Sequence, residues 1–197
     1  MKKLLLSNSF RPSNQSLRSL ALAVGVFISR LGMLPANFSP LGSFGFASGS
    51  TADSASAKLN RWWQVSLYMA SILAYDLWVG GSYRGVSFTY AGFLLYPLLG
   101  WLSRKSIRHQ ILALPTASFG FFLLSNIGVW WFWYDHTWQD LIRCFILAAP
   151  FYTRTLLSDL IFGYGWLAYG YSRANKNALV ITTSRNAANQ PAVQTTA

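Results

Sequence analysis

Residues 138–172 have the sequence WQDLIRCFILAAPFYTRTLLSDLIFGYGWLAYGYS, a run of 35 residues that is almost wholly apolar and aromatic. As one helix, this run would be about 52 Å long, whereas the hydrocarbon core of a bilayer is about 30 Å thick. Pro150 is the natural place for a break, because proline cannot donate a helix hydrogen bond. We therefore predict a short outer helix over 138–149 and a membrane-spanning helix over 151–171.

The same run contains ionisable side chains, namely Arg143, Arg154 and Asp159. Charged groups inside a membrane-spanning segment are costly, and for that reason they often mark a functional site. Just before the run, Thr137 stands three residues ahead of Asp140, which is the spacing of a capping box. This spacing predicts that the helix begins at Trp138.

The composition of the whole chain also indicates a membrane protein. Of its 197 residues, 53% are hydrophobic and 11% are charged, whereas soluble domains carry about 25% charged residues. One cysteine and two histidines exclude an internal disulfide and a cysteine- or histidine-rich metal centre. We expect no metal and no cofactor.

The net charge of +11 raises the question of a nucleic-acid partner. The basic residues, however, fall in short loops and tails between apolar runs, and they do not form one face of a fold. That distribution is typical of a multi-pass membrane protein and favours membrane lipid over nucleic acid as the partner.

The fold class that we predict is all-α: a polytopic bundle of six transmembrane helices. The expected crossings are 17–34, 37–52, 62–80, 88–103, 109–133 and 151–171. The second is short and rich in Gly and Ser, so we place it inside the bundle, where small residues allow helices to approach closely.

The transmembrane domain of residues 17–172 lies between two tails. Residues 1–16 form a basic tail, and the alternative is a cleaved signal ending near Ala23 or Ala36. Residues 173–197 are rich in Asn, Ala, Thr and Gln, and we expect them to be disordered.

The basic residues also predict an orientation. With six crossings, both tails share one side with the loops 53–61 and 104–108, and this side carries most of the Lys and Arg. The other side's loops carry Arg84 alone. This asymmetry predicts that both termini are cytoplasmic in a bacterial inner membrane.

Several polar side chains are expected at a similar depth, in the outer half of the bundle. They come from five of the six segments, and we predict that they form a substrate-binding site with Trp130, which could stack on a flat ligand. These residues are Arg30, Asn37, Asp76, Asn126, Arg154 and Asp159. The alternative is structural: they could be ion pairs and interhelical hydrogen bonds that fix the packing, and Trp130 could belong to an interfacial aromatic belt.

The first segment carries small residues at helical spacing, Ser19 with Ala23 and Ala21 with Gly25. Such pairs allow two helices to pack closely. They predict either packing within the bundle or docking against a partner membrane protein.

Four stretches together resemble the DUF6580 family, which is associated with bacterial transport. They are NFSPLGSFGF (37–46), LAYDLWVG (73–80), FFLLSNIGVWW (121–131) and APFYTRTLLSDLIFG (149–163). That family in turn resembles the substrate-binding S components of energy-coupling factor (ECF) transporters. In several S components, Pro-Phe followed by Asp marks the start of the last helix, and Pro150, Phe151 and Asp159 occupy comparable places.

The resemblance implies six transmembrane helices and an outward-facing pocket that captures a vitamin or similar micronutrient. It also implies a transmembrane coupling protein and two ATPase subunits as partners. In S components, a small-residue motif on the first helix contacts the coupling protein, and Ala21, Ala23 and Gly25 are the nearest candidates here.

We therefore expect a substrate-binding membrane subunit of an ECF-like importer. One alternative is a structural or assembly protein without a ligand. A membrane-embedded enzyme is the other, but the chain has no GxSxG, HExxH, P-loop or nucleotide-binding GxGxxG motif, and we expect no enzymatic activity.

Overall fold

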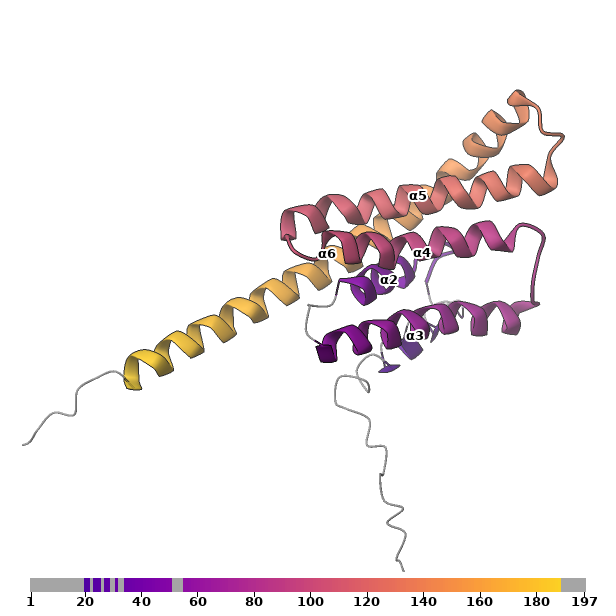
Figure 1. Cartoon of the computed structure of the whole chain (residues 1–197). Coiled ribbons are helices and arrows are strands. Elements are labelled where there is room, and N and C mark those ends of the chain that lie inside the picture. Colours follow the sequence, from indigo (N-terminus) through magenta and orange to yellow (C-terminus); the bar gives the residue numbers. More distant parts are fainter. Residues whose placement is uncertain are drawn as a thin grey trace, which may run out of the picture.

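The computed structural model describes residues 20–21, 23–25, 27–28, 31, 34–50 and 55–188. Every regular element in this part of the chain is a helix, which confirms the predicted all-α class (Figure 1). The helices are α2 (Leu41–Gly49), α3 (Ala55–Val79), α4 (Val86–Ser103), α5 (Ile107–Trp133) and α6 (Trp138–Ala188).

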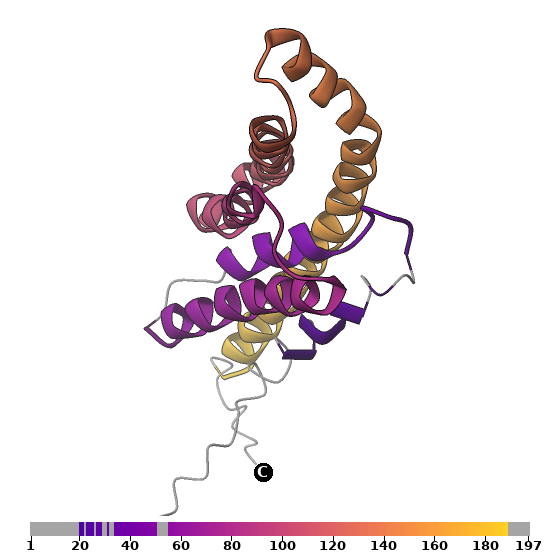
Figure 2. The same cartoon turned by 90° about the vertical axis from the view of Figure 1, so that its right-hand side faces the viewer.

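The shortest helix, α2, stands at the centre of the bundle. It contacts α3 on one side and α4, α5 and α6 on the others. Figure 2 shows this arrangement along the bundle, with α2 surrounded by the longer helices. The core includes side chains from α2, α3, α4 and α5, such as Phe46, Tyr68, Tyr96 and Leu114.

Three helices are long and apolar enough to cross a membrane: Val86–Ser103, Ile107–Trp133 and Trp138–Arg173. The first two match the predicted crossings 88–103 and 109–133 to within two residues. The polytopic membrane character therefore rests on three candidate spans in the described part of the chain, and six transmembrane helices are not confirmed.

The predicted crossing 37–52 is only nine helical residues long, from Leu41 to Gly49. Such a helix measures about 13 Å and cannot cross a 30 Å hydrocarbon core. It starts late because Pro40 is its N-cap, and a residue that precedes proline avoids the helical region. Residues 34–40 therefore remain non-helical.

The interior position predicted for the Gly/Ser-rich segment is confirmed, because eight of the nine residues of α2 are buried. Glycine allows this close packing. A side chain at position 49 would collide with the backbone carbonyl of Pro97, and one at position 100 would collide with that of Phe46. The backbones of α2 and α4 therefore touch along this contact.

The predicted break at Pro150 is wrong, because α6 continues through this residue and is 51 residues long. Pro150 cannot donate to the carbonyl of Ile146, but proline inside a membrane helix is tolerated where the surroundings adjust. The helix curves instead of ending (Figure 2). The separate outer helix over 138–149 is thus the first part of α6.

The prediction of disorder from residue 173 is also wrong as far as Ala188, where α6 ends. Adding a residue to an existing helix costs far less than starting one, and alanine favours the helix. Figure 1 shows this end of α6 projecting beyond the other helices. Residues 1–16 and 189–197 lie outside the described part.

The predicted start of α6 is confirmed at Trp138. The Thr137 hydroxyl accepts a hydrogen bond from the Asp140 backbone N–H at 3.1 Å and donates one to Asp140 Oδ2 at 2.7 Å. The first bond satisfies a backbone donor that the first turn of a helix otherwise leaves free, and the second holds the two side chains together.

Candidate ligand-binding site

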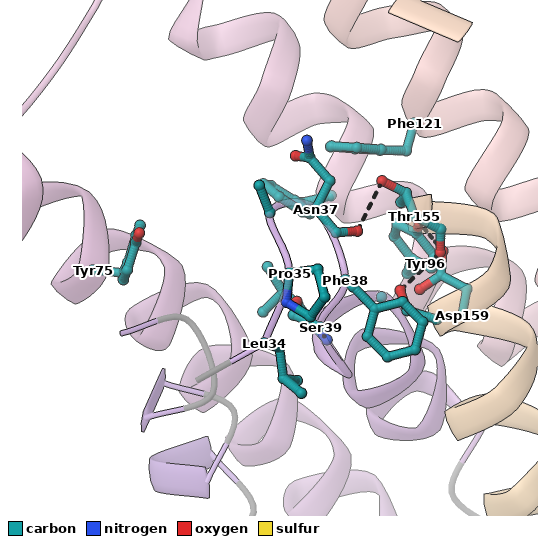
Figure 3. A pocket seen from close by; sticks show the side chains of 15 residues that line it. Leu34, Pro35, Asn37, Phe38, Ser39, Tyr75, Tyr96, Phe121, Thr155 and Asp159 are labelled. Carbon is teal, nitrogen blue, oxygen red and sulfur yellow. Dashed lines mark hydrogen bonds between the residues drawn. The ribbon is translucent and has the colours of Figure 1, made fainter. Parts of the chain in front are cut away.

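A partly open pocket of about 430 Å³ lies between the non-helical segment 34–39, the start of α2 and the helices α3, α4, α5 and α6 (Figure 3). Its lining includes Phe93 and Tyr96 of α4, Phe121 of α5 and Asp159 of α6. Each of these residues stands near the middle of its candidate span. The pocket is therefore at mid-membrane depth if these helices cross a bilayer.

Asp159 is the buried acid of this pocket and is 1% exposed. Its Oδ2 accepts a hydrogen bond of 2.5 Å from the Tyr96 hydroxyl. Its backbone carbonyl accepts another, at 3.0 Å, from the Ser43 hydroxyl of α2. Among the residues that the structure describes, no basic side chain pairs with this carboxyl group.

The first turn of α2 packs directly against this acid. A side chain at Gly42 would collide with Asp159 Oδ1 and with the Tyr96 ring. The first N–H groups of a helix carry a partial positive charge, which stabilises a nearby carboxylate. Glycine at position 42 thus lets α2, α4 and α6 meet around one acidic group.

A further hydroxyl lies next to this pair. Ser118 of α5 is fully buried, and its Oγ is close enough to interact with both Tyr96 and Asp159. It makes no hydrogen bond of good geometry within the described part of the chain. Buried polar groups are usually satisfied, so an unsatisfied one requires an explanation.

The non-helical segment closes one side of the pocket and is attached to α6. The backbone carbonyl of Asn37 accepts a hydrogen bond of 3.4 Å from Thr155 Oγ1, and the rings of Phe38 and Phe162 lie 5.8 Å apart. Asn37 has a positive φ of 63°, a conformation that Asn adopts more readily than most residues. Figure 3 shows Asn37 with its hydrogen bond to Thr155, and Phe38 beside Asp159.

A family model matches residues 10–180 and is described as DUF6580, a family of unknown function. The chain belongs to the DUF6580 family. No curated protein matches it, and no solved structure does. The comparisons thus show the family of this chain and assign no activity to it.

Of the residues predicted to bind substrate, this DUF6580 protein brings Asn37 and Asp159 together at the pocket. Arg30 lies outside the described residues. Arg154 is exposed on α6 and does not line the pocket. The other three also lie away from it, and each is engaged in a contact of its own.

These three residues make contacts typical of helix packing and helix ends. Asp76 of α3 accepts a hydrogen bond of 2.9 Å from the Tyr90 hydroxyl of α4. Asn126 Nδ2 donates to the Phe122 carbonyl of its own helix at 2.7 Å. Trp130 Nε1 donates to the Thr137 carbonyl at 3.3 Å and so closes the α5–α6 turn. The predicted polar residues therefore do not form one cluster in the described structure.

Sequence reasoning missed the aromatic and hydroxyl groups of the pocket, chiefly Tyr96, Phe121, Thr155 and Ser158. The chain has 10 Tyr and 14 Phe, and in membrane helices an aromatic residue can face lipid or protein equally well. One local signal existed for Tyr96, because it precedes Pro97 in the middle of an apolar segment.

The three small residues predicted to dock a partner differ in exposure. Ala23 is buried and belongs to the core of the bundle, whereas Ala21 and Gly25 are exposed. A side chain at Gly25 would meet nothing within 4 Å. Ala21 and Gly25 therefore leave a small-residue surface open to a partner, while Ala23 packs within the protein.

Metal ligands do not gather in the described part of the chain, where no three His, Cys, Asp or Glu side chains lie together. Cys144 is free and buried, and its thiol donates to the carbonyl of Asn126. The chemistry that the pocket offers is thus one carboxyl group, several hydroxyl groups and aromatic rings.

Proposed function

We propose that this protein is the substrate-binding membrane subunit of an ECF-like importer, which captures a micronutrient in the pocket around Asp159. The observation that supports this most is the non-helical backbone of residues 34–40 next to the middle of three candidate spans. Backbone outside a helix is tolerated at this depth where it is buried in protein or lines a cavity. Transporters often bind their substrates at such interruptions.

The size and lining of the pocket support the same function. Small-molecule sites typically measure about 300–1,000 Å³ and combine apolar walls with a few polar groups. At about 430 Å³, with Phe93, Phe121 and Tyr96 around Asp159, this pocket is of that kind. A buried acid within a membrane span is by itself a reason to expect function.

An importer also requires a source of energy, and the sequence contains no nucleotide-binding motif. We propose that a transmembrane coupling protein and ATPase subunits supply it, as the resemblance to S components implies. The exposed small residues Ala21 and Gly25 are the proposed docking surface. The proposed orientation has the pocket facing outward and both termini in the bacterial cytoplasm, in accord with the basic tails.

A structural or assembly role is the second candidate, and the hydrogen bond between Tyr90 of α4 and Asp76 of α3 favours it. This bond links two helices without a ligand. The two candidates differ in one outcome: an assembly protein carries no solute in the pocket, whereas a binding subunit carries one.

Native mass spectrometry of the detergent-purified full-length protein tests this difference. We expect a co-purified small molecule on the natural protein and on Thr153→Trp, but not on Thr155→Trp. Thr155 lines the pocket, whereas Thr153 is exposed and bonds within its own helix. If no form carries a solute, or if both variants keep it equally, the proposed function is wrong.

A further inference from the structure

Building on the proposed solute-binding function, the geometry points to an organic cation as the class of ligand. The ligand would be a protonated amine on a flat, apolar body, with its ammonium group bonded to Asp159. Three features of the pocket carry this inference: its charge, the remaining acceptor capacity of Asp159 and its aromatic walls.

The charge of the pocket is one-sided. Among its described lining residues, Asp159 is the single carboxyl group and no Lys, Arg or His is present. A carboxylate removed from water is unfavourable unless it is paired and hydrogen-bonded. The Tyr96 hydroxyl supplies one bond, and the first turn of α2 supplies a fraction of a positive charge. A bound cation would complete the neutralisation.

The carboxyl group can also accept further hydrogen bonds. Tyr96 bonds Oδ2, Oδ1 lies against Gly42, and the Ser118 hydroxyl is close to the carboxyl group. An ionised carboxylate has about four acceptor positions, whereas an ammonium group carries up to three donors and no acceptor. An ammonium group therefore suits this acid.

Aromatic side chains also line the pocket, namely Phe93, Tyr96 and Phe121. The rings of Phe93 and Phe121 lie 4.5 Å apart, and the Tyr96 ring lies 6.1 Å from Phe121. Figure 3 shows Phe121 and Tyr96 on the side of segment 34–39 that faces Asp159. Aromatic faces attract cations and provide a surface for a flat molecule.

An anionic ligand fits the site less well, although the first turn of a helix can bind anions. Here the N-terminal turn of α2 already faces Asp159, so a phosphate or carboxylate would meet a like charge at close range. A neutral ligand would leave the buried carboxylate without a counter-charge. The cation is the class that the charges and contacts favour together.

The test compares three probes with the same ring, namely benzylammonium, benzyl alcohol and benzoate, on the full-length protein in detergent. We expect benzylammonium to bind with a dissociation constant at least tenfold lower than that of the other two. Asp159→Asn should raise the dissociation constant of benzylammonium tenfold or more, because hydrogen bonds to charged groups are stronger than those between neutral groups. It should leave benzyl alcohol unchanged.

The matched control is Asp135→Asn, which neutralises an exposed acid in the α5–α6 loop and should leave all three affinities unchanged. Because Asp159→Asn could fail to fold, Thr155→Lys provides a second test. It places a positive charge at the pocket and keeps Asp159 in place. We expect it to weaken the binding of benzylammonium at least tenfold and to strengthen the binding of benzoate.

Tighter binding of benzoate or benzyl alcohol to the natural protein overturns the cation inference but leaves the solute-binding function intact. So does an anionic solute found by native mass spectrometry. The inference is also wrong if Asp159→Asn and Thr155→Lys both bind the three probes with the same relative affinities as the natural protein. If no probe binds and no solute co-purifies, both proposals are wrong.

Discussion

The shortest and the longest helices of this protein, α2 and α6, show opposite relations between composition and burial. α2 has nine residues, three of them glycine and three of them serine or alanine, and eight of the nine are buried. α6 has 51 residues, and its large apolar side chains, such as Ile146, Ile161 and Trp166, are exposed. In α2, small residues are buried among the other helices, whereas in α6 many large apolar residues face outward.

Hydrophobicity and burial are therefore separate properties in a membrane-type fold. Lipid tails are as apolar as leucine, so the association of helices depends on close packing and on polar contacts. α2 provides both. Its glycines bring backbones together, and Ser43 and Gly42 contact Asp159.

The largest expected effect tests the close packing of α2. Gly100→Ala places a methyl group against the backbone carbonyl of Phe46, which cannot move away as a side chain could. We expect the free energy of unfolding in detergent to fall by roughly 3 kcal/mol, the upper range for overpacking. Denaturant titration followed by circular dichroism measures it.

Gly165→Ala on α6 is the matched control, because a side chain there meets nothing within 4 Å. Alanine favours the helix over glycine, so this variant should be unchanged or more stable by about 0.5–1 kcal/mol. Equal destabilisation by both substitutions would contradict the comparison between α2 and α6.

The next effect tests the bond between α4 and α6. Tyr96→Phe removes the donor to Asp159 Oδ2 and leaves the buried acid with one bond fewer. The free energy of unfolding should fall by about 1.5–3 kcal/mol, the range for hydrogen bonds to charged groups. Thermal unfolding reports it.

Tyr83→Phe serves as the reference for this variant. It removes a hydrogen bond to Thr89 at an exposed position, where changes usually stay within about 0.5 kcal/mol. If the two tyrosine variants behave alike, the Tyr96–Asp159 contact does not stabilise the fold.

The smallest effect concerns a polar contact remote from α2. Asp76→Ala removes the acceptor for the Tyr90 hydroxyl, and interhelical bonds of this kind contribute on average about 0.6 kcal/mol. Solute retention in native mass spectrometry should not change, because Asp76 does not line the pocket. Loss of the solute would show instead that Asp76 itself belongs to the site, as the sequence alone predicts.

Features of the fold that depend on local chemistry were predictable from the sequence. Thr137 and Asp140 predicted the start of α6, and the glycines and serines of α2 predicted its interior position. The helix break predicted at Pro150 was wrong, because a proline that would end a short helix of a soluble protein is tolerated in a long apolar helix. The sequence did not predict that α2 has only nine residues and is too short to cross a bilayer, although Pro40 marks its beginning.

The candidate site was predictable only in part, for a physical reason. Asp159 was found because an acid is rare in an apolar run. Its neighbours were not, because a helix surrounded by lipid and protein is apolar on every side and has no periodicity that marks the inner face. Asp76 and Asn126 are polar like Asn37, and only the tertiary packing decides which of the three lines the pocket.

The uninterrupted course of α6 from Asp159 to Ala188 has a mechanical consequence. These two residues are about 44 Å apart along one helix. If a solute in the proposed pocket tilts this helix slightly about the acid, the far end of the helix moves by several ångströms. A spin label at that end of α6 would then report whether the pocket is occupied.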